Sequence, residues 1–235
     1  MSNFIHFKDV VVNRPETWKG KRILSLDIDW ASDKILNYTL DMIEEKGCKA
    51  CFFVTHQTKV LERIKENPLI ELGIHPNFNP LLDGVKDSKT AAQIIDDLLE
   101  IVPNAQILRS HSMTTSGKWV GLYKQKGITH LSNYLQYGVE PIVPFMQING
   151  LVEVPVYFAD DGFAYINESK EIVNITKNLL FSTNVEGIKV FNFHPVHLYI
   201  DTENISDYYS YKINEMIIKK THSFGSRSIL DMLKS

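Results

Sequence analysis

The stretch RILSLDIDW, residues 22–30, decides the fold class of this 235-residue chain. Its mostly apolar run over residues 22–28 predicts a buried β-strand. The following residues, 32–46, carry apolar side chains at the spacing of one helical face, at Ile35, Leu36, Leu40 and Ile43. Ser32 is a suitable N-cap and Gly47 a suitable stop, so the stretch predicts a strand that leads directly into a helix.

The same alternation of strand and helix continues along the chain. Further strands are predicted over residues 50–54, 69–74, 107–109, 152–158 and 187–193. Further helices are predicted over residues 60–66, 91–101, 168–180, 211–219 and 226–233. This order is typical of a parallel sheet with crossover helices. No repeat or linker interrupts it, so we expect residues 1–235 to form a single α/β domain.

Composition excludes several classes of protein. The chain has 25 Lys and Arg residues against 28 Asp and Glu residues, and its net charge of −3 argues against a nucleic-acid partner. No stretch approaches the ~18 apolar residues of a membrane span. Residues 1–10 lack the basic and then apolar pattern of an export signal. We therefore expect a soluble cytoplasmic protein without a transmembrane segment.

Polar and charged side chains gather just after the predicted strands. The carboxyl ends of parallel strands meet at one edge of the sheet, where α/β enzymes hold their active sites. The side chains expected to converge there are Asp27, Asp29, His75, Asn79, Arg109, Asp160, Asp161, His194 and His197.

The first four of these residues have side chains that suit metal binding. Alternate residues of a strand share a face, so Asp27 and Asp29 can point into one pocket. Two such carboxylates repel each other unless a cation or a proton lies between them. His75 is a nitrogen donor suited to zinc and similar metals. Asn79 can lend an amide oxygen, or it can simply form a turn before Pro80.

The remaining residues suit proton transfer and its support. Arg109 can pair with a carboxylate and hold it ionised. Asp160 and Asp161 can hold that arginine in place, or they can open a solvated turn. One of His194 and His197 can serve as a general acid, and the other is then structural.

Taken together, these motifs resemble the polysaccharide deacetylase family, which carries the NodB homology domain. The sequence LSLDID at residues 24–29 is similar to the family's first motif, and ACFFV at 50–54 to a family strand. The segment from Gly73 to Asn79 lies where the family has H-x-x-x-H. Arg109 matches the arginine of R-x-P, Asp161 matches the aspartate that orients this arginine, and Phe193-His194 resembles the closing L-x-H motif.

This resemblance implies a fold, a chemistry and a set of roles. The fold would be an irregular (β/α) barrel with about seven parallel strands. The reaction would be metal-assisted hydrolysis of an N-acyl group, such as acetyl, on an amino sugar, with zinc as the expected divalent metal. Asp27 would be the catalytic base, oriented by Arg109, and His194 would be the general acid. The metal would be held by Asp29, His75 and Asn79.

Two departures from the family pattern leave alternatives open. Asn79 stands where the family has a second histidine, and a neutral amide oxygen is a weaker ligand for a first-row metal. Arg109 is followed by Ser110 and His111 rather than by the family's proline, and His111 can be a ligand or an acid. A carbohydrate-binding protein without catalytic activity is therefore one alternative.

A phosphatase of the haloacid dehalogenase type, with Asp27 as its nucleophile, is a second alternative, because residues 27–29 also resemble its D-x-D motif. On the main hypothesis, the expected lack of export points to an intracellular substrate. Such a substrate would be a carbohydrate intermediate linked to a nucleotide or to a lipid.

Overall fold

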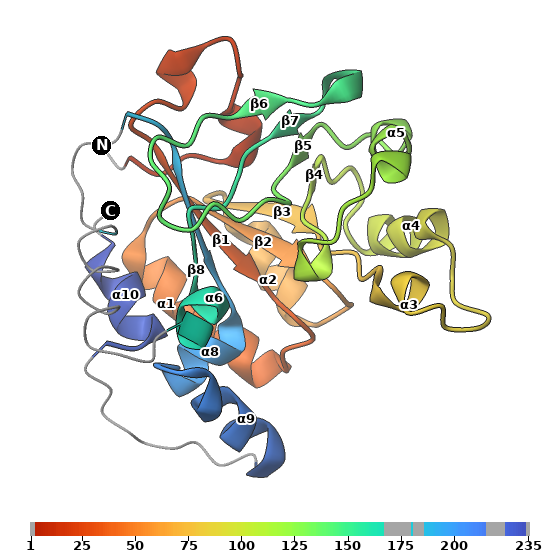
Figure 1. Cartoon of the computed structure of the whole chain (residues 1–235). Helices are drawn as coiled ribbons and strands as arrows, with labels where there is room; N and C mark the ends of the chain where they lie inside the picture. Colours follow the sequence, from red (N-terminus) through yellow and green to blue (C-terminus); the bar gives the residue numbers. More distant parts are fainter. Residues whose placement is uncertain (1–2, 167–179, 181–185, 215–223, 234–235) are drawn as a thin grey trace.

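The computed structural model describes residues 3–166, 180, 186–214 and 224–233, and these form one curved sheet surrounded by helices (Figure 1). Within these residues the sheet has nine strands in the order β6-β7-β5-β4-β3-β2-β1-β9-β8. The strands are β1 (Arg22–Asp27), β2 (Ala50–Val54), β3 (Ile70–Ile74), β4 (Ile107–Leu108), β5 (His130–Leu131), β6 (Phe145–Met146), β7 (Val152–Glu153), β8 (Phe158–Ala159) and β9 (Lys189–Phe193).

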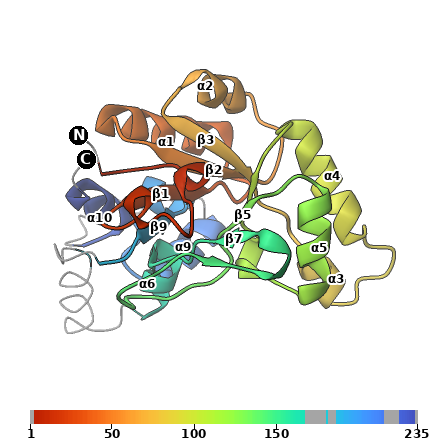
Figure 2. The same ribbon diagram turned by 90° about the horizontal axis from the view of Figure 1, so that it is seen from above.

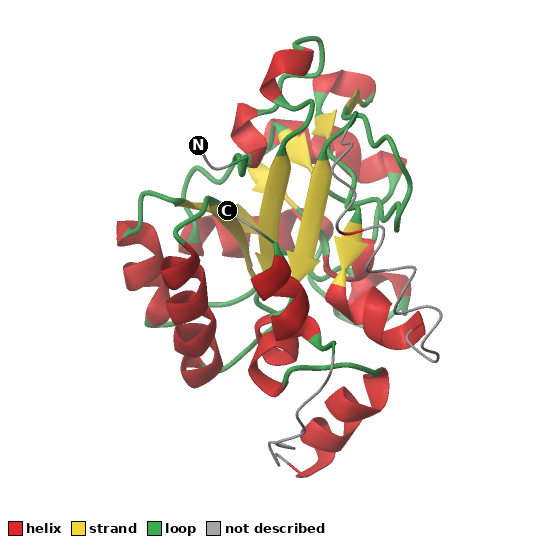
Figure 3. Cartoon of the chain, turned by 90° about the vertical axis from the view of Figure 1, so that its left-hand side faces the viewer, coloured by secondary structure: helices red, strands yellow, loops and turns green. Residues whose placement is uncertain are grey.

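Nearly all neighbouring strands run parallel, and β6 alone pairs in the antiparallel sense, with β7. The helices lie around the outside of the curved sheet, as the views from above and from the side show (Figures 2 and 3). The expected α/β class and its (β/α) barrel form are thus confirmed, as a curled sheet that makes a half-barrel. The described sheet has more strands than the expected seven because several of its strands are only two residues long.

The helices follow the strands closely in the sequence. They are α1 (Asp33–Lys46), α2 (Val60–Glu66), α3 (Asn79–Leu82), α4 (Ala91–Ile101), α5 (Gly117–Gln125), α6 (Asp160–Ile166), α8 (Pro195–Ile200), α9 (Ile205–Asn214) and α10 (Ser226–Met232). The prediction for residues 226–233 is confirmed within one residue. The helix predicted over 168–180 lies almost wholly outside the described residues. The helix predicted from Tyr211 begins earlier, at Ile205, and its second half also lies outside them.

The first strand–helix unit forms as its sequence predicts. The apolar face of α1, at Ile35, Leu36, Leu40 and Ile43, is buried. Gly47 ends the helix in the left-handed conformation, with φ of 61°, which glycine adopts without steric cost. β1 is an interior strand of the sheet, between β2 and β9, and its side chains from Ile23 to Asp27 are all buried. The carboxyl end of β1 therefore lies between the ends of two other strands.

The single strand predicted over residues 152–158 is wrong. The segment instead contains β7, which pairs with β5 and β6, and β8, which pairs with β9 at the opposite edge of the sheet. Pro155 lies between them and has no backbone N–H to donate to a strand partner. A short connection thus links a strand next to one edge of the sheet with the strand at the opposite edge.

Several described elements were not expected from the sequence, among them α3, α5, α6, α8, β5 and β6. Residues 117–125 form α5 and residues 130–131 form β5, and neither segment shows a strong apolar period. No helix of the described residues is both long enough and apolar enough to cross a membrane.

Candidate active site

The carboxyl ends of the central strands bring five of the predicted residues together. Asp27 ends β1 and Asp29 lies two residues beyond it. His75 directly follows β3, Arg109 follows β4 and His194 follows β9. Ion pairs and short contacts connect all five side chains. Their convergence confirms the expectation that the ends of parallel strands would assemble a polar site.

Asp27 is a buried carboxylate that is held ionised. Its Oδ1 accepts a hydrogen bond from Arg109 Nη1 at 3.0 Å, and its Oδ2 accepts one from Asn192 Nδ2 at 2.8 Å. Burial alone would raise the pKa of Asp27, but the Arg109 guanidinium, with His75 and His194 nearby, outweighs it and holds the pKa below its usual value. The group is therefore a proton acceptor at neutral pH.

Arg109 is completely buried and uses its whole guanidinium group. Nη1 also donates to Ser25 Oγ at 3.0 Å and to Asn192 Oδ1. Nη2 donates to Ser132 Oγ at 2.9 Å, and Nε donates to the Ser132 carbonyl at 3.1 Å. The guanidinium carbon lies 4.3 Å from the centre of the Phe53 ring. This network fixes the arginine against the carboxylate of Asp27.

Asp29 reaches the site through a turn and not through strand alternation. β1 ends at Asp27, and both Asp29 and Trp30 adopt positive φ angles, of 37° and 56°. Such angles are uncommon for residues other than glycine and usually persist only where surrounding contacts hold them. One such contact is the hydrogen bond that the Trp30 N–H donates to Thr55 Oγ1 at 3.2 Å. The expected convergence of the two aspartates is correct, but its cause differs from the one expected.

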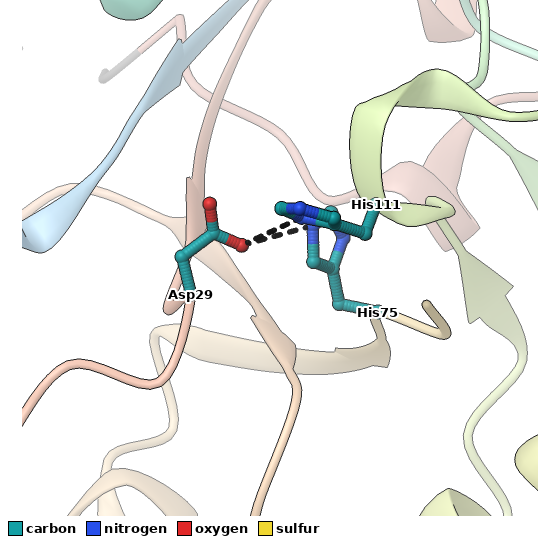
Figure 4. Close-up of side chains that lie close together, drawn as sticks. All are labelled: Asp29, His75 and His111. Carbon is teal, nitrogen blue, oxygen red and sulfur yellow. Dashed lines mark hydrogen bonds and ion pairs between the residues drawn. The ribbon is translucent and has the colours of Figure 1, made fainter. Parts of the chain in front are cut away.

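Asp29, His75 and His111 form a compact cluster (Figure 4). The same oxygen of Asp29, Oδ1, lies 3.2 Å from His75 Nε2 and 3.2 Å from His111 Nδ1. Burial favours a higher pKa for Asp29, but the hydrogen bonds from His111 and His75 outweigh it and lower the pKa strongly. A carboxylate and two imidazoles are a donor set that suits zinc.

The two ring nitrogens of the buried His75 have different surroundings. Nε2 faces Asp29 in the cluster, whereas Nδ1 has no hydrogen-bond partner within the described part of the chain. The acidic oxygen that faces Nδ1 is Asp27 Oδ1 at 3.8 Å, which is too far for a hydrogen bond. His75 thus lies between the two aspartates.

Asn79 lies beside this cluster, at the start of α3. Its Nδ2 donates to Ser112 Oγ at 3.2 Å, and its Oδ1 accepts from Thr114 Oγ1 at 3.3 Å. Both partners belong to the loop that carries His111. These hydrogen bonds of Asn79 hold the loop that carries His111 in place. The role of Asn79 as a metal ligand stays a prediction.

His194 is aimed at both aspartates by Asp160, whose role as its partner was not recognised from the sequence. Asp160 is fully buried, its Oδ1 lies 2.7 Å from His194 Nδ1, and its Oδ2 accepts the His194 backbone N–H at 3.0 Å. An ionised carboxylate only accepts, so Nδ1 carries a proton and Nε2 faces the site. Nε2 lies 3.8 Å from Asp27 Oδ2 and 3.7 Å from Asp29 Oδ2.

The protonation of His194 follows from its acidic neighbours. Burial alone would lower the pKa of His194, but Asp161 and Asp160 outweigh it and raise the pKa well above its ordinary value. This shift favours the protonated imidazole, which is the form that can act as a proton donor.

Asp161 does not orient Arg109, contrary to the expected pairing. The hydrogen bonds of the Arg109 guanidinium go to Asp27, Ser25, Asn192 and Ser132. Asp161 instead accepts the Gly162 N–H at 2.7 Å and lies in a cluster with Asp160 and His194. The reason is topological, because α6 begins directly after β8, which pairs with β9 and so lies next to the strand that presents His194.

His197 stays on the periphery of the site. Its Nδ1 hydrogen-bonds to Thr202 Oγ1 at 2.8 Å, and burial lowers the pKa of its ring. Its ring packs edge-on against His194, with centroids 5.5 Å apart. These contacts suit a structural residue.

Removal of the Asp160 carboxylate should change the pH dependence of any reaction that needs protonated His194. In Asp160→Asn we expect the alkaline limb of the pH–rate profile to move about 1–3 pH units lower. The reason is that a nearby opposite charge changes the pKa of an ionisable group by about 1–3 units, and the substitution removes this charge from His194. The measurement is the rate as a function of pH, with Asp97→Asn, an exposed site, as the matched control. An unchanged alkaline limb would show that Asp160 does not act through His194.

Comparisons with known proteins agree with this arrangement of side chains. A family model described as WbmS-like polysaccharide deacetylase matches residues 24–212. The crystal structure of a Bordetella bronchiseptica protein, assigned as a polysaccharide deacetylase involved in O-antigen biosynthesis, is 34% identical, covers 97% of this chain and 96% of its own, and gives a TM-score of 0.85. A Mycobacterium smegmatis protein assigned as a polysaccharide deacetylase shares the fold, at 16% identity over 86% and 85% of the two chains, with a TM-score of 0.54. Among curated proteins, no relative matches the chain.

Proposed function

Because the chain belongs to the WbmS-like family of polysaccharide deacetylases, we propose that it is a metal-dependent hydrolase that removes an N-acyl group, such as acetyl, from an amino sugar. One observation supports this most strongly. At a single edge of the sheet, the ionised Asp27 and the imidazole of His194 lie 3.8 Å apart, and both contact the cluster of Asp29, His75 and His111. A base, an acid and a set of metal ligands are the groups that amide hydrolysis needs.

We assign Asp29, His75 and His111 as the residues that hold the metal, with zinc the best match to their donor atoms. When bound, a divalent ion supplies Lewis acidity toward the acyl carbonyl and lowers the pKa of a water molecule beside it. His111 would then take the place of the second histidine that the sequence lacks at Asn79. Asn79 would act as a positioning residue, through its hydrogen bonds to Ser112 and Thr114.

The proton transfers fall to the chain's own side chains. Asp27, kept ionised by Arg109, removes a proton from the attacking water. His194, held by Asp160, donates a proton to the sugar nitrogen as the C–N bond breaks, so that the amine leaves in neutral form. An acylated amino sugar and water thus give a free amino sugar and a carboxylic acid.

Release of acetate from N-acetylated amino sugars tests this function. Enzyme treated with a chelator should be inactive, and added zinc or cobalt should restore activity. Hydrolysis of p-nitrophenyl phosphate with magnesium would instead indicate a phosphatase that uses Asp27. Sugar binding without bound metal and without acetate release would indicate a carbohydrate-binding protein, and either result would overturn the proposal.

The ligand assignment makes a separate prediction about metal affinity. In His111→Ala we expect zinc affinity to fall by more than about 100-fold, since one of the three assigned ligands is lost. In Asn79→Ala we expect a fall of about 10-fold, as is typical of residues that only support a ligand. Isothermal titration of the metal-free proteins with zinc measures both values, and thermal unfolding verifies that each variant folds. A larger loss in Asn79→Ala than in His111→Ala would show that Asn79 is the ligand.

A further inference from the structure

A cleft of about 520 Å³ opens directly beside Asp29. We call it the aromatic cleft, because Trp30, Tyr199 and Tyr208 are among the residues that line it. Trp30 comes from the turn after β1, Tyr199 from α8 and Tyr208 from α9, and these helices lie together at the lower end of the molecule in Figure 1. Its volume lies in the range of about 300–1,000 Å³ that is usual for sites of small organic ligands.

The aromatic lining suits a ligand with flat or apolar faces. Trp30 keeps 49% of its surface exposed, which is unusual for so large an apolar residue. Tyr199 and Tyr208 are half-buried and remain accessible from the cleft. Rings of this kind combine a large contact area with a polar edge, and they bind sugar rings and nucleobases by their faces.

Two lysines also line the cleft. Lys34 Nζ lies 5.6 Å from the centre of the Tyr199 ring, and Lys212 Nζ lies 5.7 Å from the centre of the Tyr208 ring. Among the lining residues that the structure describes, Asp29 is the one carboxylate, and it is already assigned to the metal. The cleft is therefore positive in a chain whose net charge is −3.

These observations lead to an inference about the substrate, which rests on the proposed deacetylase function. We infer that the substrate is an N-acylated amino sugar that carries a phosphate or pyrophosphate group. The acyl group lies at Asp29, the sugar or its attached base lies against the aromatic rings, and the phosphate oxygens pair with Lys34 and Lys212. Lysine binds phosphate as a point charge, so these flexible side chains suit an anionic linkage without a fixed geometry.

Equilibrium binding to the full chain tests this inference separately from catalysis. In Asp27→Asn, which should slow turnover by about 10²–10⁴, we expect N-acetylglucosamine 1-phosphate and uridine diphosphate N-acetylglucosamine to bind at least about 10-fold more tightly than N-acetylglucosamine. In the background of that variant, Lys34→Gln combined with Lys212→Gln should remove this preference and leave the binding of the neutral sugar unchanged. Lys86→Gln, at an exposed lysine outside the cleft, is the matched control and should change nothing.

A polyprenyl pyrophosphate N-acetylglucosamine with a short lipid chain distinguishes the source of the phosphate. Tighter binding of the nucleotide sugar than of the lipid-linked sugar, or the reverse, supports the inference and identifies the carrier, provided that the two lysines are required. Equal binding of phosphorylated and neutral sugars, or no effect of the double lysine substitution, overturns it. Lysine-dependent binding of the phosphorylated sugars without acetate release by the unmodified chain would overturn the proposed function alone.

Discussion

Replacement of Asp27 by asparagine should lower kcat/KM for acyl-group hydrolysis by about 10²–10⁴, the usual contribution of a general base. Asparagine has nearly the same shape and can keep part of the hydrogen bonding to Arg109 and Asn192, but it cannot accept a proton from water. Steady-state release of acetate from the metal-loaded enzyme measures the effect.

Two controls make the Asp27 result specific. Zinc affinity should stay within a few-fold of the unmodified chain, since Asp27 is not among the assigned ligands. Asp83→Asn, at an exposed position just after α3, should leave kcat/KM unchanged. If Asp27→Asn retains more than about a tenth of the activity, Asp27 is not the base.

The largest effect on stability is expected at Arg109. In Arg109→Met the free energy of unfolding should fall by about 3–5 kcal/mol, because the change leaves the buried Asp27 carboxylate without its charged partner. Urea unfolding at pH 7 measures this loss. Arg14→Met removes an exposed arginine whose side chain is 64% exposed in its ion pair, and it should change the free energy by less than about 1 kcal/mol.

The pH dependence of this loss has a definite sign. In the unmodified chain the pKa of Asp27 is lowered, so its contribution to stability is present above the unfolded pKa and is lost as the pH falls. In Arg109→Met the buried carboxyl can become neutral at low pH and then needs no cation. The difference in unfolding free energy between the two proteins should therefore narrow as the pH falls from 7 toward 4. A constant difference would mean that the loss comes from packing and not from the charge pair.

The parts of this site that the sequence predicted are those fixed by topology. Asp27, His75, Arg109 and His194 each follow an apolar strand, and parallel strands necessarily bring their carboxyl ends to one edge. Once the strands are recognised, the convergence of these four side chains needs no further information.

The parts that were missed depend on short elements and on loop geometry. Asn192 has a signal in the sequence, since it interrupts the apolar run of β9 and its backbone lies opposite Ser25 in the sheet. Ser132 had none, because it follows the two-residue strand β5, which is too short to show a period. The pairing of Asp160 with His194 depends on β8 joining the edge of the sheet beside β9, which the apolar pattern of residues 152–158 did not reveal.

The same limit of sequence analysis applies to the candidate metal ligand His111. It follows Arg109 by two residues, its ring centre lies 5.5 Å from that of His75, and Ser112 and Met113 turn the loop directly after it with φ angles of 55° and 50°. Sequence spacing could thus identify His111 as a candidate but could not decide between a ligand and an acid.

The connection between β7 and β8 has a consequence for how the molecule opens. The N–H of Val154 donates to the carbonyl of Leu131 in β5, whereas the N–H of Tyr157, three residues later, donates to the carbonyl of Val190 in β9, beside the opposite edge of the sheet. Thermal fraying usually starts separately at the two margins of an open sheet, but here both margins share one short peptide. Local unfolding at one edge of the sheet should therefore disturb the other edge as well. We expect the strands that carry the polar cluster to open together and not one edge at a time.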